Sequence, residues 1–282
     1  MIIGGVAAGT RAASKARRLD PSMEITVVTD EQYISYAGCG LAYYIGGVVK
    51  SRNDLFARSP EYFRGKQNID LRLRTRAERI NIWDREVKIQ DLERATAQTL
   101  PYDRLVIATG TSAVKPSIPG IDGHGVFTLH NIPDADAIRS WLDSESPRRA
   151  CIMGGGFIGI EMAENLRHRG LDVTVFEMAD RLMPGLYGAD SSKLILDAMA
   201  EHGVDIRTGT KVEAFNAGTG GRIASVTAGG MEYPCDIAIV AAGVTPNNEL
   251  AREANIAVGP TGGIRTNDRL ETSSRGIYAR SE

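Results

Sequence analysis

The chain has 282 residues, of which 43% are hydrophobic and 24% are charged, as in an ordinary globular protein. This length favours about two domains with sizeable cores. A net charge of −2 gives no reason to expect nucleic acid as a partner, and the longest apolar runs, such as residues 237–244, are too short to span a bilayer.

The N-terminal residues MIIGGVAAGTRAASKARR place no positive charge before their apolar stretch, so they do not form a secretory signal. We therefore expect a cytoplasmic protein without membrane attachment. The three widely spaced cysteines, Cys39, Cys151 and Cys235, do not form a disulfide framework in that compartment. Apolar surroundings predict that Cys151 and Cys235 are structural.

The first predicted unit consists of a strand, a glycine turn, a helix and a second strand. A short strand at residues 1–3 leads into the turn GGVAAG at residues 4–9. A helix is expected over residues 10–20, and an alternating strand over residues 23–30.

The glycine pattern of this first turn is imperfect for a dinucleotide. Aligned on Gly4 and Gly9, its middle position is Val6, which is expected to push a pyrophosphate slightly away. Thr29 ends the following strand where an acid is usual, so ribose recognition is expected to shift to Asp30.

Three further features precede the middle of the chain. Residues 79–92 alternate about a polar tip and predict a hairpin, and residues 102–110 predict a buried strand ending in a tight turn. Residues 112–123 carry prolines and are typical of a linker.

Residues 149–178 repeat the strand, glycine turn, helix and strand. Here Gly154, Gly156 and Gly159 form a complete G-x-G-x-x-G pattern, and Glu177 ends the next strand 18 positions after the last glycine. The glycines allow close approach to a pyrophosphate, and the helix N-terminus supplies N–H groups. Glu177 can accept hydrogen bonds from a ribose and disfavours a 2′-phosphate, so NADH is favoured over NADPH.

The remaining residues predict a return to the first domain. Residues 211–243 are typical of hairpin strands followed by another buried strand, and residues 262–282 are expected to rejoin the first unit. Two βαβ units about 150 positions apart indicate an α/β protein with two doubly wound domains.

These motifs, together with SYAGCGLAYYIGG (35–47), VIATG (106–110) and VAAGVTPN (240–247), resemble the single-cysteine branch of the flavoprotein pyridine nucleotide-disulfide oxidoreductases. The similarity is greatest to coenzyme A-disulfide reductases and their persulfide-reducing relatives. It implies Rossmann-like domains: an FAD-binding domain in two parts, 1–112 and 243–282, and an NAD(P)H-binding domain, 113–242, inserted between them.

The resemblance also implies two sets of cofactor contacts. The FAD set comprises Gly4, Val6, Ala8, Gly9, Thr29, Asp30, Ser35, Ala108, Thr109 and Gly110. The NAD(P)H set comprises Gly154, Gly156, Phe157, Ile158, Gly159, Glu161, Glu177 and Gly243. For Phe157 the alternative is helix–sheet packing, and for Glu161 it is a plain solvent-facing acid.

The sequence departs from the family pattern at further places, including a first strand that begins a few residues short. Ala42 replaces the usual proline after CGL, and Arg280, Ser281 and Glu282 stand where a small residue, glycine and aspartate usually meet FAD. No residues follow for the dimerisation domain that completes the active site in relatives. The expectation is therefore a C-terminally truncated chain of a homodimeric parent.

Cys39 is the predicted redox centre. The two-cysteine members of the family use C-x₄-C, but neither Ile34 nor Tyr44 is a cysteine. The partner sulfur or oxygen must therefore come from outside. The leading hypothesis is that electrons pass from NAD(P)H through FAD to a Cys39–coenzyme A mixed disulfide or a related persulfide. The alternatives are an NADH oxidase or peroxidase using a Cys39 sulfenic acid, or a catalytically silent nucleotide-binding fragment.

A row of basic residues could select the substrate. Arg11, Lys15 and Arg18 lie on one face of the first helix at spacing i, i+4 and i+7. Through the resemblance, this face and Ser35 are expected to bind coenzyme A phosphates, although a solvated face is an equal alternative. The four scattered histidines have no metal-ligand spacing, so no metal site is expected.

Overall fold

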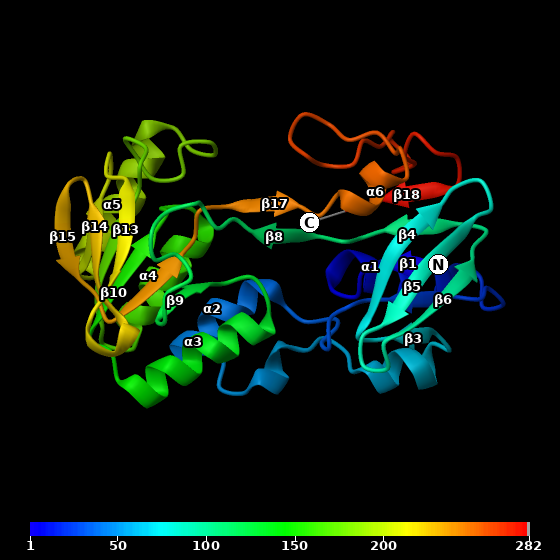
Figure 1. Ribbon diagram of the computed structural model, residues 1–282, viewed down its shortest axis with the longest axis horizontal. Coiled ribbons are helices and arrows are strands. Elements are labelled where there is room, and N and C mark those ends of the chain that lie inside the picture. Colours follow the sequence, from blue (N-terminus) through cyan, green and yellow to red (C-terminus); the bar gives the residue numbers. More distant parts are fainter. Residues whose placement is uncertain (281–282) are drawn as a thin grey trace. The chain divides into compact units, whose positions relative to one another are not determined.

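A computed structural model describes residues 1–280 of the chain (Figure 1). These residues form two compact units. The first unit contains Met1–Ala37, Phe56–Ser112 and the residues from Thr245 onward, and the second contains Gly38–Leu55 and Ala113–Val244. Both segments of the second unit thus lie between segments of the first in the chain.

The first unit is built on a five-stranded parallel sheet of order β18-β7-β1-β2-β3. Its strands are β1 (Ile2–Ile3), β2 (Thr26–Val28), β3 (Asp70–Arg72), β7 (Leu105–Ile107) and β18 (Ile277–Ala279). Helix α1 (Ala7–Leu19) connects β1 to β2. It is rich in alanine and arginine, which favour helix, and Asp20 is extended before Pro21.

The first unit also contains an antiparallel sheet of order β4-β5-β6. Its strands are β4 (Thr75–Asn81), β5 (Glu86–Asp91) and β6 (Thr96–Pro101). The predicted hairpin over 79–92 is therefore present, with a third strand added. The unit also contains η3 (Tyr62–Lys66), a π-helical turn, and α6 (Glu249–Glu253).

The second unit repeats the parallel plan in the order β12-β11-β10-β16-β9. Its strands are β9 (Val126–Thr128), β10 (Arg149–Met153), β11 (Asp172–Phe176), β12 (Val204–Arg207) and β16 (Ile237–Val240). Helices α3 (Ile132–Glu145), α4 (Phe157–His168) and α5 (Ala189–Glu201) connect them. Strand β16, which lies between β10 and β9, is buried along its whole length, as expected with both faces of a parallel sheet covered.

Three antiparallel strands join this unit in the order β13-β14-β15. They are β13 (Val212–Ala217), β14 (Ile223–Ala228) and β15 (Met231–Pro234), with the short turn η4 (Thr219–Gly221) between the first two. Two of the passages of the chain from one unit to the other fall within β8 (Thr111–Ala113) and β17 (Val244–Pro246), and the other two lie on either side of residues 38–55.

Residues 38–55 group with the second unit, although the sequence predicts that they belong to the domain 1–112. They contain η1 (Gly38–Gly40), α2 (Leu41–Gly46) and η2 (Arg52–Leu55). Helix α2 packs against α3 and α4, which belong to the second unit. This packing, rather than position in the chain, decides where the segment belongs.

Each unit buries its own apolar core. In the first unit, one cluster includes Ile3, Val28 and Ile107, and another includes Ile2, Val27 and Leu71. In the second, Phe176 and Val226 belong to the cluster beneath the antiparallel sheet. Among the described helices, none is long and apolar enough to cross a membrane.

Candidate functional site

The second glycine turn, residues 154–159, joins β10 to α4. Gly154 has φ +109°, and a Cβ there would lie 2.2 Å from the carbonyl oxygen of Ala241. A Cβ on Gly159 would lie 1.9 Å from the carbonyl oxygen of Gly154. At Gly156, by contrast, a Cβ would meet nothing within 4 Å. Gly159 thus lets the turn close on itself, Gly154 lets the turn approach the residue that follows β16, and Gly156 leaves open space at the start of α4.

Glu177 lies beside this turn, directly after β11. Its Oε2 accepts a hydrogen bond from the Gly155 N–H at 2.7 Å, and its Oε1 accepts one from the Ala179 N–H at 2.8 Å. The side chain is half-buried. These two donors hold the carboxylate in place, and each oxygen keeps a further lone pair for a ribose hydroxyl.

The remaining residues predicted to contact NAD(P)H lie on α4 or after β16. Phe157 opens α4 and is 53% exposed, whereas Ile158 is half-buried. Glu161 is half-buried one turn later, and burial together with the charge of Glu164 raises the pKa of its carboxyl. Gly243 is exposed at φ +103°.

The first glycine turn, residues 4–9, closes in the same way. Gly4 has φ +113°, and a Cβ there would lie 2.0 Å from the carbonyl oxygen of Ala108. A Cβ on Gly9 would lie 2.0 Å from the carbonyl oxygen of Gly4. Val6 occupies the position that corresponds to Gly156, immediately before α1, and Ala8 is half-buried in the first helical turn. Helix α1 begins at Ala7, three residues before the predicted start, because the turn leads straight into it.

The two residues that follow β2, Thr29 and Asp30, lie in different surroundings. Thr29 is buried, and its hydroxyl accepts a hydrogen bond from the Glu31 N–H at 3.4 Å. Asp30 is exposed, and its carboxylate lies 3.5 Å from the guanidinium of Arg76. A ribose hydroxyl bound to the Asp30 carboxylate would therefore share that carboxylate with the Arg76 guanidinium.

Ser35 lies directly against the first glycine turn. Its N–H donates a hydrogen bond to the carbonyl of Gly5 at 3.0 Å, and its own carbonyl accepts one from Ala57 at 2.7 Å. It is buried and adopts φ 52°, an uncommon conformation for a residue other than glycine. These backbone bonds hold Ser35 against the first glycine turn.

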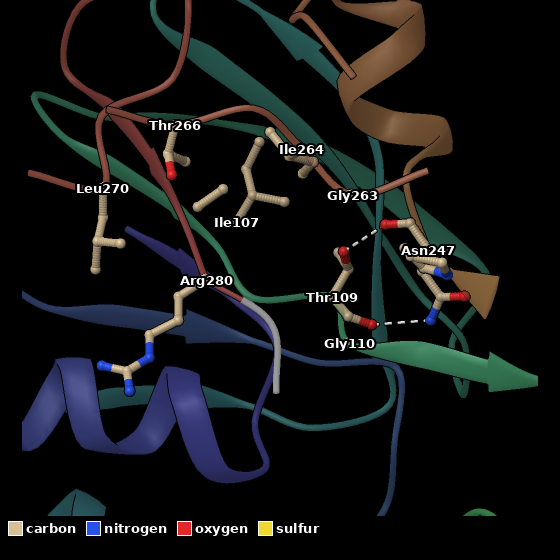
Figure 2. Close-up of a pocket in the computed structure, with 11 residues that line it drawn as sticks. Ile107, Thr109, Gly110, Asn247, Gly263, Ile264, Thr266, Leu270 and Arg280 are labelled. Atoms are coloured by element: carbon tan, nitrogen blue, oxygen red, sulfur yellow. Dashed lines mark hydrogen bonds between the residues drawn. The ribbon is translucent and has the colours of Figure 1, made fainter. Parts of the chain in front are cut away.

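A pocket of about 580 Å³ lies at the carboxyl ends of β7 and β18 (Figure 2). Thr109 and Gly110 line it together with Asn247, Leu270 and Arg280. The hydroxyl of Thr109 donates to the Asn247 carbonyl at 2.6 Å, and the Asn247 side chain donates back to the Thr109 carbonyl at 2.9 Å. Asn247 was not among the predicted site residues, although it ends the motif VAAGVTPN.

Cys39 lies in the turn η1, immediately before α2, and is exposed. The other two cysteines are buried, as predicted. The hydrogen bond with Cys235 and burial raise the pKa of the Cys151 thiol, so Cys151 stays protonated. Because Cys151 and Cys235 are buried, Cys39 is the one of the three cysteines that an external molecule can reach.

The predicted basic face of α1 is present. Arg11, Lys15 and Arg18 are exposed, and none of them makes an ion pair or side-chain hydrogen bond with a described residue. Arg17, between them, is instead engaged with the carbonyls of Gln67 and Asn68. The face therefore offers three cations to an outside ligand.

Both glycine turns fit a dinucleotide. Each precedes a helix of more than ten residues without a side-chain cap, so first-turn N–H groups face the space where a pyrophosphate would lie. The first turn carries the side chain of Val6 where the second has Gly156, at which an added Cβ would meet nothing within 4 Å. Two doubly wound units with dinucleotide-type glycine turns, together with an exposed cysteine, are typical of redox proteins that bind two nucleotides.

Comparison with known proteins agrees with this class. The family model described as pyridine nucleotide-disulphide oxidoreductase matches residues 1–280, and the chain belongs to this family. Ser281 and Glu282, which replace the family's glycine and aspartate, lie outside the described residues.

Among the relatives, an NADH oxidase of Methanocaldococcus jannaschii is 33% identical over 99% of this chain and 61% of its own length. A coenzyme A disulfide reductase of Staphylococcus haemolyticus is 31% identical, with the same two shares. Among solved structures, an NAD-dependent persulfide reductase of A. fulgidus matches with a TM-score of 0.94 and 39% identity, over 99% of this chain and 51% of that one. The chain thus spans about three fifths of the length of these curated relatives.

Proposed function

We propose that the protein is an FAD- and NAD(P)H-dependent oxidoreductase that reduces coenzyme A disulfide, or a related persulfide, through Cys39. The observation that carries the proposal is the isolation of the Cys39 thiol. It is exposed while Cys151 and Cys235 are buried, and it lies four residues after Ser35, which is bonded to the first glycine turn. A relative named as a coenzyme A disulfide reductase supports the substrate class.

The first glycine turn, Ser35 and the turn around Thr109 would hold FAD. The second glycine turn and Glu177 would hold the nicotinamide cofactor, with NADH preferred because the carboxylate repels a 2′-phosphate. When bound, FAD relays two electrons from NADH to sulfur. The protein's own contributions are to bind both nucleotides, to present the thiol and to attract the anionic substrate.

The reaction at Cys39 is thiol–disulfide exchange. Its thiolate attacks one sulfur of coenzyme A disulfide, forming a mixed disulfide and releasing one coenzyme A thiolate. Reduction of the mixed disulfide by two electrons then releases the second thiolate and restores Cys39. Overall, NADH, one proton and one coenzyme A disulfide give NAD⁺ and two coenzyme A thiols.

Arg11, Lys15 and Arg18 would bind the phosphates of coenzyme A. Each side chain is exposed and lacks an acidic partner among the described residues, so binding would not break an existing ion pair. Ser35, in the segment that leads to Cys39, would contribute a further contact to coenzyme A. Three free cysteines also fit a reducing cytoplasmic compartment.

An NADH oxidase or peroxidase reaction is the second candidate, favoured by the relative of that name. In the peroxidase reaction, hydrogen peroxide would oxidise the Cys39 thiolate to a sulfenic acid with release of hydroxide, and two electrons and two protons would then restore the thiol and release water. In the oxidase reaction, oxygen would first have to take up two electrons and two protons from NADH and solvent to give that peroxide. Both candidates require Cys39, but they differ in the acceptor.

NADH consumption by the purified FAD-loaded chain would test the proposal, with coenzyme A disulfide under nitrogen, with hydrogen peroxide under nitrogen, and with oxygen alone. We expect turnover with the disulfide, its loss in Cys39→Ser, and its retention in Cys151→Ser, since Cys151 is buried in the core. Turnover that needs only oxygen would replace the leading candidate with the second. A chain that loads FAD but oxidises NADH with none of these three acceptors would contradict both candidates.

A further inference from the structure

The helix that follows Cys39 is too short to be stable alone. Helix α2 comprises six residues, Leu41–Gly46, and isolated helices of that length are marginal in water. Its last carbonyl groups have no partners within the helix. Gly47, at φ 80°, donates its N–H to the carbonyls of Tyr43 and Tyr44. Further carbonyls at this end need partners from elsewhere in the unit.

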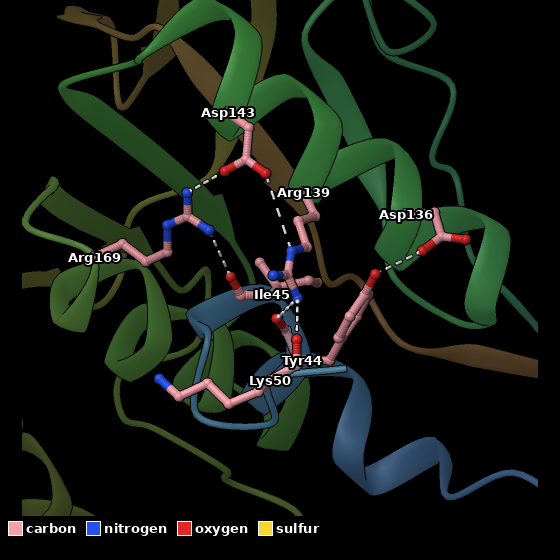
Figure 3. Close-up of polar contacts among 7 residues, drawn as sticks. All are labelled: Tyr44, Ile45, Lys50, Asp136, Arg139, Asp143 and Arg169. Carbon is pink, nitrogen blue, oxygen red and sulfur yellow. Dashed lines mark hydrogen bonds and ion pairs between the residues drawn. The ribbon is translucent and has the colours of Figure 1, made fainter. Parts of the chain in front are cut away.

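Two arginines of the second unit supply those partners (Figure 3). Arg139, on α3, donates to the carbonyl of Tyr44 at 3.2 Å and to that of Lys50 at 3.5 Å. Arg169, which directly follows α4, donates to the carbonyl of Ile45 at 3.2 Å. A cation at the C-terminal end of a helix also interacts favourably with the helix dipole.

The two guanidinium groups are themselves held in place. Asp143 accepts from Arg169 at 2.5 Å and lies 4.0 Å from the Nε of Arg139. The Arg139 guanidinium lies 4.5 Å from the centre of the Tyr44 ring. The Tyr44 hydroxyl donates to Asp136 at 3.0 Å, and burial raises the pKa of Tyr44, which keeps this donor protonated. These contacts form one connected network.

Close packing fixes the same end of the helix against α4. A Cβ on Gly46 would lie 2.2 Å from the side-chain oxygen of Asn165, which is 1% exposed. The Asn165 amide in turn donates to the backbone carbonyl of Glu161 at 2.8 Å. The C-terminal end of α2 therefore has no room to shift towards α4.

We propose that Arg139 and Arg169 are positioning residues for Cys39. They hold the C-terminal end of α2, and Cys39 lies two residues before its first residue, so a fixed helix fixes the thiol. Neither arginine is assigned contact with substrate or nucleotide. We call these two arginines the clamp. Their importance for turnover rests on the proposed function, whereas their effect on the order of Cys39 does not.

The clamp can be tested on the full chain without cofactor or turnover. Hydrogen exchange is measured for peptides covering residues 38–49, and a nitroxide spin label on Cys39, the one exposed cysteine, reports local mobility. In Arg139→Met, we expect exchange in this segment to become about tenfold faster and the label more mobile, because a charge-assisted hydrogen-bond donor is lost. Arg169→Met should act in the same direction.

Two further variants separate positioning from general damage. Arg139→Lys retains a cation with N–H donors and should restore most of the protection and the label's immobility. Lys193→Gln breaks an exposed ion pair with Asp197 on α5 of the same unit and should match the wild type. If Arg139→Met does not fold, Asp143→Asn provides the milder change, with faster exchange expected in the same segment.

Unchanged exchange and label mobility in the folded variants would overturn the proposal. So would faster exchange with an unchanged label, because that result would separate the order of α2 from that of Cys39. Failure of the proposed function would instead appear as NADH- and disulfide-dependent turnover that survives Cys39→Ser. The two failures are therefore distinguishable.

Discussion

The backbone N–H of Gly155 donates a hydrogen bond to the carboxylate of Glu177, 2.7 Å away. This contact joins the second glycine turn to the acid that ends the neighbouring strand. The turn that would approach a pyrophosphate and the group that would bind a ribose are thus held in a fixed relation before any ligand arrives. Such preorganisation lowers the ordering cost of binding.

Glu177→Gln should weaken NADH binding about tenfold, because a neutral amide accepts weaker hydrogen bonds than a carboxylate. Binding of NADPH should weaken less, or improve, since the charge that repels the 2′-phosphate is gone. Titration of each nucleotide by fluorescence would measure both dissociation constants. Asp172→Asn, which removes an exposed charge from the far end of the same strand, is the control and should leave both constants unchanged.

Gly156→Ala and Gly159→Ala should separate binding from folding. At Gly156 an added Cβ meets nothing, so thermal stability should be retained while NADH binding falls because the pyrophosphate is blocked. At Gly159 the Cβ would clash with the Gly154 carbonyl, and the variant should lose about 1–3 kcal/mol of stability. Thermal unfolding and NADH titration would be compared. Equal stability losses would contradict the assigned roles.

Charge reversal at Arg18 should raise the KM for coenzyme A disulfide about tenfold and leave the KM for NADH unchanged. The physical reason is that Arg18 is exposed and free of acidic partners among the described residues, so its charge is available to a phosphate. Lys193→Glu makes the same charge change on α5 and serves as the control. An unchanged KM for the disulfide in Arg18→Glu would assign this face of α1 to solvent.

The stability of the second unit should depend on pH through Asp236. Hydrogen bonds from the Arg149 guanidinium, at 2.7 and 3.2 Å, hold the pKa of this carboxyl below its usual value of 3.8. Because the folded-state pKa is lowered, the stabilisation is complete above the unfolded pKa. It is lost as the pH falls through the folded pKa.

Asp236→Asn should therefore cost about 1 kcal/mol at neutral pH, a modest value because the Arg149 side chain is half exposed. The difference from the wild type should shrink as the pH falls below about 4. Urea unfolding at several pH values would measure it. A difference that stays constant down to the lowest pH would show that the carboxylate charge is not the cause.

The doubly wound units could be predicted from sequence because their signals are local. Gly154, Gly156 and Gly159 have fixed spacing between an apolar strand and a helix, and Glu177 follows at the expected distance. The first turn could be predicted only in part, because Val6 and Thr29 depart from the pattern. The structure shows that Gly4 and Gly9 nevertheless close it in the same way.

The surroundings of Cys39 could not be predicted, because they depend on contacts between residues far apart in the sequence. Arg139 and Tyr44 are 95 positions apart, and neither belongs to a recognisable motif with the other. The grouping of residues 38–55 with the second unit has the same origin, since α2 is fixed by α3 and α4. The hydrogen bond between Thr109 and Asn247 joins residues that are even farther apart in the sequence.

The FAD content of the purified chain tests the central claim most directly, because both sulfur and oxygen chemistry at Cys39 require that electron carrier. We predict a yellow protein that retains about one FAD per chain after gel filtration, or takes it up when FAD is added. The bound flavin should be bleached by NADH under nitrogen. A colourless protein that takes up no FAD would contradict the account, whatever its affinity for NADH.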